Sequence, residues 1–216
     1  MKQGAIFDLD GLMFDTERLY QEKWKEIAAE MGFELAPEQG LDFTGKAGRQ
    51  LCAAVEKHYH VEDGSVIVKE CARRVHKVLE EYMPEKPGLH EILDFFKNNG
   101  VKLAVASSSM KEVICNNIRR SGVEEYFDVV VSGFEVACGK PAPDVFHHAA
   151  EKLGLDPKDC YVFEDSISGV RAGFAAGCVT VMVPDILQPT EEIKHMYVGI
   201  YTSLLEAMEE IKAGEI

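Results

Sequence analysis

The chain has 216 residues, of which 46% are hydrophobic, so we expect a substantial core in one domain or in one domain with a smaller second one. Its formal net charge of −14 argues against nucleic acid or an anionic membrane as the main partner. We find no Cys-x-x-Cys pair, no secretory signal and no apolar run long enough to span a bilayer, and therefore expect a soluble cytoplasmic protein with reduced cysteines.

The first predicted element is a buried strand over residues 4–7, and it is followed at once by Asp8 and Asp10. Two carboxylates one residue apart repel each other unless a positive group lies between them, so both are candidates for chemistry. A surface turn is the ordinary alternative, because aspartate and glycine favour turns. A calcium loop is excluded, because its twelfth position requires glutamate and this chain has Leu19 there.

The next part of the chain has helical patterns and no convincing strand. The spacing of apolar residues predicts helices over 16–31, 49–58 and 65–83, after which prolines interrupt the pattern. We therefore expect residues 16–83 to form a helical domain inserted after the first strand.

From residue 89 onward, strands alternate with helices. We predict strands over 101–106, 127–131, 160–163 and 179–183, and helices over 89–98, 111–121, 143–153, 166–176 and 203–213. This alternation is typical of an α/β fold with a doubly wound parallel sheet. The core domain would comprise residues 1–15 and 84–216, with the helical insertion between them.

Polar residues follow several of these strands. Ser107 follows one strand, Glu164 and Asp165 follow another, and Lys140 precedes a helix. Each has a structural alternative: serine can cap a helix, acids favour helix N-termini, and a loop lysine can be solvated. Parallel strands, however, would gather these groups and the two aspartates at one sheet edge. Oxygen ligands without histidine favour Mg²⁺ over zinc, and the lysine and hydroxyl suit a phosphate.

The motifs Asp-x-Asp-Gly, Val-Ala-Ser, Gly-Lys-Pro-Ala-Pro-Asp and Phe-Glu-Asp-Ser, in this order, resemble those of the haloacid dehalogenase superfamily. More narrowly, the chain resembles the branch that contains β-phosphoglucomutase and sugar-phosphate phosphatases. The resemblance implies a Rossmann-like core in which Asp8 is the nucleophile and becomes an aspartyl phosphate. Asp10 would be the general acid and then the general base.

The same resemblance implies the binding groups. Ser107 and Lys140 would hold the phosphoryl oxygens. Mg²⁺ would be bound by the carboxylates of Asp8 and Asp165 and by the backbone carbonyl of Asp10. Glu164 would be either a further ligand or a residue that contacts the ligands without binding the metal.

The helical insertion resembles the cap that selects substrates in this family. In the segment 45–49, Arg49 matches an arginine that contacts substrate phosphate in the mutase, if one gap is allowed. A solvated arginine at a helix start is the equal alternative.

The resemblance favours a magnesium-dependent phosphatase acting on a small phosphorylated metabolite, first of all a sugar phosphate. β-Phosphoglucomutase is the alternative, weakened because Tyr20 stands where the mutase has a cap histidine. A pyrophosphatase or a non-catalytic binding protein ranks lower. We expect a monomer, because a cap must be able to swing.

Overall fold

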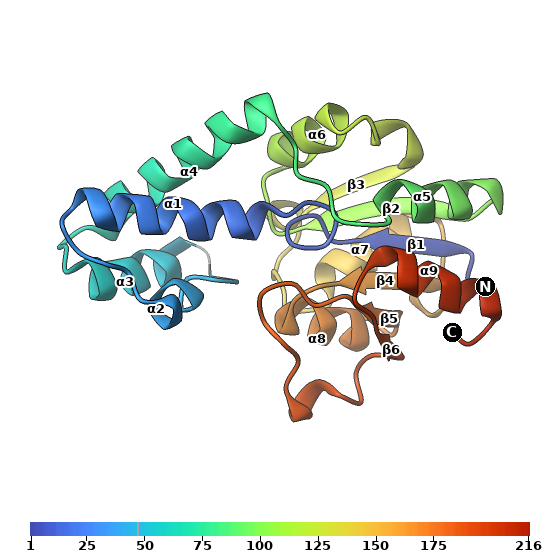
Figure 1. Ribbon diagram of the computed structural model, residues 1–216. Coiled ribbons are helices and arrows are strands. Elements are labelled where there is room, and N and C mark those ends of the chain that lie inside the picture. Colours follow the sequence, from blue (N-terminus) through green and yellow to red (C-terminus); the bar gives the residue numbers. More distant parts are fainter. Residues whose placement is uncertain (47) are drawn as a thin grey trace. The chain divides into compact units, whose positions relative to one another are not determined.

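The computed structural model describes residues 1–46 and 48–216, so Ala47 of the segment 45–49 lies outside the described residues. The chain divides into two compact units, which are drawn in Figure 1. One comprises Met1–Phe14 and Glu85–Ile216, and the other comprises Asp15–Pro84. Each limit lies one residue from the domain boundary expected from the sequence.

The larger unit is built on a sheet with the strand order β3-β2-β1-β4-β5-β6, in which all neighbouring strands run parallel. The strands are β1 (Gly4–Phe7), β2 (Lys102–Ser107), β3 (Val129–Ser132), β4 (Cys160–Glu164), β5 (Val179–Met182) and β6 (Gly199–Ile200). The predicted α/β class with a doubly wound parallel sheet is confirmed. Because β1 pairs with both β2 and β4, the strand order reverses beside β1, and in such sheets ligands bind at the carboxyl ends of the strands at this reversal.

Helices cover both faces of this sheet. They are α5 (Leu89–Asn98), α6 (Lys111–Arg120), α7 (Asp144–Leu153), α8 (Ile167–Ala175) and α9 (Leu204–Ala213), with 3-10 turns η1 (Glu124–Tyr126), η2 (Gly133–Glu135), η3 (Pro157–Asp159) and η4 (Glu191–Ile193). Successive residues of a strand point to opposite faces. Thus Ile6 of β1 packs in the cluster formed with α7 and α8, whereas Phe7 contacts Phe96 of α5 with ring centroids 6.2 Å apart.

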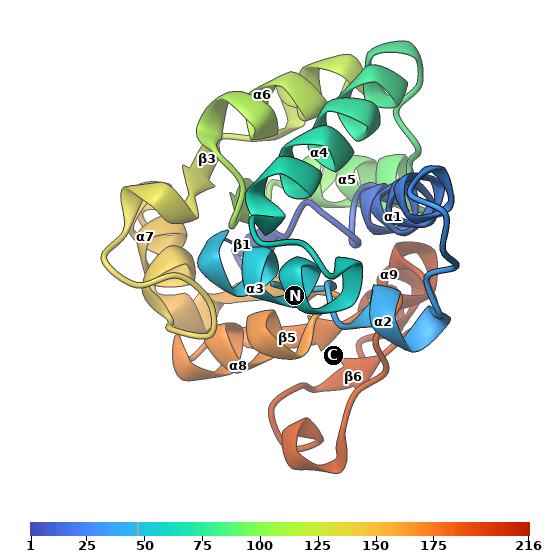
Figure 2. The same ribbon diagram turned by 90° about the vertical axis from the view of Figure 1, so that its left-hand side faces the viewer.

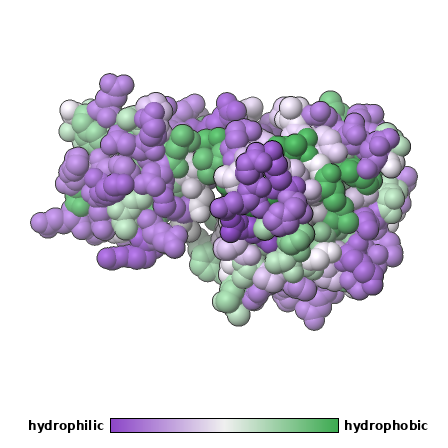
Figure 3. All heavy atoms as spheres, turned by 90° about the horizontal axis from the view of Figure 1, so that it is seen from below, coloured by the Kyte–Doolittle hydropathy of each residue, from purple (hydrophilic) through white to green (hydrophobic). Residues whose placement is uncertain are grey.

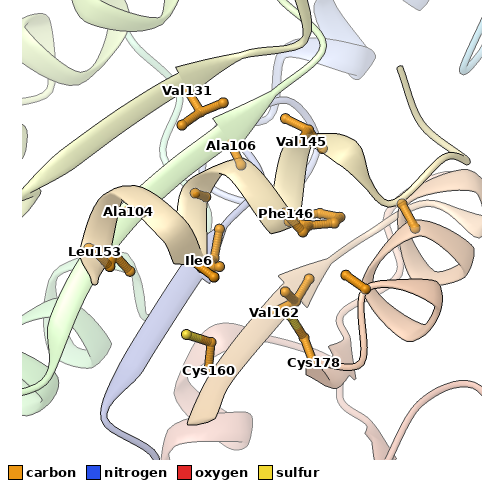
Figure 4. Packing of buried hydrophobic residues seen from close by; sticks show 14 residues of the cluster. Ile6, Ala104, Ala106, Val131, Val145, Phe146, Leu153, Cys160, Val162 and Cys178 are labelled. Atoms are coloured by element: carbon orange, nitrogen blue, oxygen red, sulfur yellow. The ribbon is translucent and has the colours of Figure 1, made fainter. Parts of the chain in front are cut away.

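Buried side chains of α7 pack against the central strands of the sheet and hold them in place. Figure 4 shows Phe146 and Leu153 of α7 lying over Ile6 of β1 and Val162 of β4. These side chains are at most 3% exposed. Strands that are buried on both faces are apolar throughout, as the four buried residues of β1 are. The polar residues that follow β1 therefore have a rigid support.

The smaller unit is helical in its described residues. Its helices are α1 (Thr16–Glu30), α2 (Pro37–Leu41), α3 (Gly48–Tyr59) and α4 (Gly64–Glu81), and α4 packs against both α1 and α3 (Figure 2). Trp24, Phe43 and Tyr59 form its aromatic centre, with the Trp24 and Phe43 rings 5.1 Å apart. The Tyr59 hydroxyl donates a hydrogen bond of 2.5 Å to the Trp24 carbonyl, so the one polar atom of this buried ring is satisfied.

On the face shown in Figure 3, hydrophilic residues predominate and hydrophobic ones occupy several separate areas. None of the helices described here has both the length and the apolar character needed to cross a bilayer.

Two short elements were not predicted from the sequence. The five residues of α2 are too few to establish a helical period, and the two residues of β6 are too few to alternate. The strand expected over 127–131 begins later, at Val129, and ends at Ser132. These differences lie away from the strand ends that carry the candidate residues.

Candidate active site

Asp8 and Asp10 lie in the turn that leaves β1. The backbone N–H of Asp8 donates to the carbonyl of Phe163 on β4 over 3.1 Å, which continues the sheet pairing by one residue. The chain then turns at Gly11, whose N–H donates to the Phe14 carbonyl over 2.8 Å. Gly11 has φ of +87°, and a Cβ there would also overlap the Asp165 carboxylate. The glycine is therefore required both by the turn and by the neighbouring acid.

Lys140 brings its ammonium group into contact with two of the predicted acids. Its Nζ donates to Asp8 Oδ1, to Glu164 Oε1 over 2.5 Å and to the Ala106 carbonyl over 3.2 Å. The Lys140 side chain is 5% exposed, and its Nζ also lies 4.9 Å from the Phe146 ring centroid. The lysine thus joins the ends of β1, β2 and β4 and offsets the repulsion between the two carboxylates.

Burial shifts the pKa values of both Asp8 and Lys140. Desolvation raises the pKa of Asp8 to about 8; Lys140 opposes the shift and the Glu164 carboxylate adds to it. Desolvation lowers the pKa of Lys140, but attraction to Asp8 and Glu164 more than compensates and leaves it above its ordinary value. Lys140 is therefore charged at neutral pH. A cation beside Asp8 would favour the ionised carboxylate that a nucleophile requires.

Glu164 is the most completely enclosed acid of the group, with 0% exposure. Its Oε2 accepts hydrogen bonds from the N–H groups of Asp165 and Ser166, both 3.2 Å, and from the Ser166 hydroxyl at 3.0 Å. A Cβ on Gly169 of α8 would overlap the Glu164 carboxyl group. The start of α8 therefore forms a fitted cradle for this carboxylate, and Lys140 holds its other oxygen.

The acids could hold a metal ion. Asp8, Glu164 and Asp165 each offer a carboxylate oxygen, and these three atoms lie within 4.8 Å of one another. This donor set consists only of hard oxygen ligands, which fits a divalent cation such as Mg²⁺. Because both oxygens of Glu164 already accept hydrogen bonds, Asp8 and Asp165 are better suited as direct ligands. The Asp10 carboxylate is not part of this group among the described residues, and metal binding by the Asp10 backbone carbonyl stays a prediction.

Three serines, Ser107, Ser109 and Ser132, are linked to one another at the ends of β2 and β3. Ser107 and Ser132 end β2 and β3 as paired residues, and each is 1% exposed. The Ser107 hydroxyl accepts from the N–H of Ser109 over 3.0 Å. The Ser109 hydroxyl in turn donates to Asp10 Oδ2 over 2.8 Å. Ser107 was predicted as a site residue. Ser109 was not, although the three consecutive serines at 107–109 can be read from the sequence.

Arg49 belongs to the other compact unit of the chain. It is the second residue of α3, in the smaller unit, and it is exposed. Exposure fits both a solvated arginine and a ligand for substrate, so its role stays a prediction. Of the residues predicted from the sequence, Asp8, Lys140, Glu164 and Asp165 are brought together most closely.

Comparison with known proteins agrees with this arrangement. Residues 5–183 match the family described as "Haloacid dehalogenase-like hydrolase". The chain is 34% identical over 179 residues to the phosphorylated carbohydrates phosphatase of Thermotoga maritima, covering 81% of this chain and 82% of that protein. It is 29% identical over 185 residues to hexitol phosphatase B of Escherichia coli K12, covering 83% and 82% respectively.

A solved structure extends the likeness over nearly the whole chain. A crystal structure from Thermotoga maritima, assigned provisionally as a β-phosphoglucomutase, superposes with a TM-score of 0.82 at 30% identity. The match covers 98% of this chain and 99% of that one. This chain therefore belongs to the haloacid dehalogenase-like hydrolases, and its named relatives support a phosphatase activity.

Proposed function

We propose that this protein is a magnesium-dependent phosphatase that hydrolyses a small phosphorylated sugar or a related metabolite through an aspartyl phosphate. The observation that carries the proposal is the contact of Lys140 with both Asp8 and Glu164. A buried carboxylate beside a charged ammonium and a cluster of acids suits attack on a phosphate, provided that a cation completes the charge balance. The sugar-phosphate class is supported by the relatives that act on phosphorylated carbohydrates and hexitols.

The reaction would proceed in two steps. A carboxylate oxygen of Asp8 attacks phosphorus, the bond from phosphorus to the sugar oxygen breaks, and that oxygen takes a proton from Asp10. Asp10 then removes a proton from water, whose oxygen attacks the same phosphorus. The bond from phosphorus to Asp8 breaks, which releases inorganic phosphate and restores Asp8.

The remaining groups would stabilise charge. Lys140 would bind a phosphoryl oxygen through an ammonium donor, and Ser107 would do so through its hydroxyl. Asp8, Asp165 and the Asp10 carbonyl would hold Mg²⁺, with Glu164 keeping Lys140 in place. When bound, the metal would neutralise phosphoryl oxygens and favour ionised Asp8. In the smaller unit, acting as a cap, Arg49 would contact a phosphate of the substrate.

A substrate panel tests this proposal. We expect Mg²⁺-dependent phosphate release from a few hexose or pentose phosphates, and loss of that release when the metal is removed by chelation. Asp165→Asn should raise the Mg²⁺ concentration needed for half-maximal rate by about 10-fold or more, because a charged ligand is lost. Asp159→Asn, in the turn before β4, is the matched control and should not change it.

The panel also separates the alternatives. β-Glucose 1-phosphate is included, with glucose 6-phosphate followed as a product. Its formation with little free phosphate would favour the mutase, despite Tyr20. Release from pyrophosphate alone would favour a pyrophosphatase. Absence of turnover on every compound with Mg²⁺ present would contradict the enzymatic proposal.

A further inference from the structure

The contact between Ser109 and Asp10 has no part in the roles assigned above. Ser109 lies in the loop between β2 and α6, and its hydroxyl donates to Asp10 Oδ2 over 2.8 Å. The ordinary role of a serine before a helix is to cap it. Here the N-cap residue of α6 is Met110, which makes no side-chain capping hydrogen bond. The Ser109 hydroxyl is therefore directed to the aspartate.

Ser109 is itself held on both sides of its backbone. Its N–H donates to the Ser107 hydroxyl over 3.0 Å, and its carbonyl accepts from the Ser132 hydroxyl over 2.7 Å. Ser107 and Ser132 are almost fully buried at the ends of paired strands. The Ser132 hydroxyl also accepts from the N–H of Phe134 over 3.2 Å, which fixes its orientation. The hydroxyl that reaches Asp10 is thus supported by rigid parts of the sheet.

We propose that Ser109 is a positioning residue for Asp10, and this rests on the proposed function. A carboxyl group that transfers protons must be held in one orientation toward the reacting oxygen. The hydrogen bond from Ser109 to Oδ2 would fix the rotation of the carboxyl group, and so the direction in which Asp10 gives a proton to the leaving group and later takes one from water. Ser109 takes up no proton and forms no bond to phosphorus.

The test uses the release of the leaving group with enzyme in excess, which isolates the first step. A sugar phosphate has a poor leaving group and needs the acid, whereas p-nitrophenyl phosphate has a good leaving group and needs it little. We expect Ser109→Ala to slow the sugar phosphate about 10- to 100-fold, by analogy with other misplaced catalytic groups, and p-nitrophenyl phosphate by less than about 3-fold. Ser109→Thr keeps a hydroxyl and should restore most of the rate. Ser108→Ala, in the exposed neighbouring residue, is the control.

Several results would overturn this role. Equal losses on both substrates would indicate damage to the loop. A change confined to KM, measured separately in the steady state, would indicate direct contact with substrate. An unchanged rate in Ser109→Ala would show that the hydrogen bond is dispensable. The variant Asp10→Asn distinguishes failure of the acid role of Asp10 from failure of the positioning role of Ser109. If that variant retains the full rate on the sugar phosphate, the acid role of Asp10 itself fails; if it is slow and Ser109→Ala is not, only the positioning role fails.

Discussion

Replacing Asp8 with asparagine is expected to lower phosphate release by at least about 10⁴-fold, as removal of a nucleophile does in other enzymes. The amide has the size of the acid but neither its charge nor its nucleophilicity. Lys140 would keep Glu164 and the Ala106 carbonyl as partners, so the site should remain folded. Because burial penalises the ionised Asp8, the thermal midpoint of Asp8→Asn should equal or exceed that of the natural protein in the absence of metal.

The measurement combines phosphate release with thermal unfolding. Asp94→Asn is the matched control, because Asp94 is an exposed residue of α5 in the same unit. It should leave the rate unchanged. An Asp8→Asn protein with the full rate would contradict the nucleophile assignment. A loss of activity accompanied by a large fall in the midpoint would contradict the expected tolerance of the fold.

Replacing Gly169 with alanine is expected to lower both the stability of the fold and the rate of phosphate release, by displacing Glu164. The added methyl would overlap the Glu164 carboxyl group, so either the carboxylate or the start of α8 must move. Overpacking of this kind costs about 1 to 3 kcal/mol in the free energy of unfolding. Glu164 holds Lys140, which contacts Asp8, so a shift of the carboxylate would also displace the ammonium. We expect the rate to fall by about 10²-fold.

Gly139→Ala is the matched control for this substitution. Gly139 precedes Lys140, yet nothing lies within 4 Å of the position that its Cβ would occupy. Urea denaturation and the rate of phosphate release should both be close to those of the natural protein. Adding Glu164→Asp to Gly169→Ala shortens the acid and should recover part of the lost stability. If the two glycine substitutions changed stability and rate equally, that would contradict the inference that α8 encloses the Glu164 carboxyl group.

The sequence predicted the strand ends well because they combine two independent signals. The buried strand before Asp8 and the strand before Glu164 are short apolar runs, and each ends at an acid. Parallel strands place such ends at one sheet edge, so the meeting of Asp8, Lys140 and Glu164 follows once the class of sheet is known. The family motifs added the roles, which are not readable from polarity alone.

The hydrogen-bond partner of each polar side chain could not be predicted from the sequence. Ser107 and Ser109 look alike in the run of three serines, yet one accepts from the backbone and the other reaches Asp10. Glu164 and Asp165 are adjacent acids, but only Glu164 is enclosed by α8 and Lys140. These distinctions depend on backbone direction over a few residues. Gly169 likewise looks like an ordinary helix glycine until Glu164 is placed beside it.

In the proposed mechanism phosphorus becomes bonded to Asp8 during turnover, and this intermediate can be trapped. The protein would be mixed with a sugar phosphate that it hydrolyses and Mg²⁺, quenched in acid within milliseconds, and reduced with borohydride, which converts an aspartyl phosphate to homoserine. Peptide mass spectrometry should find homoserine at residue 8 and at no other aspartate, and none without substrate. Homoserine at another position, or turnover with no modified residue in the quenched sample, would contradict an aspartyl phosphate at Asp8.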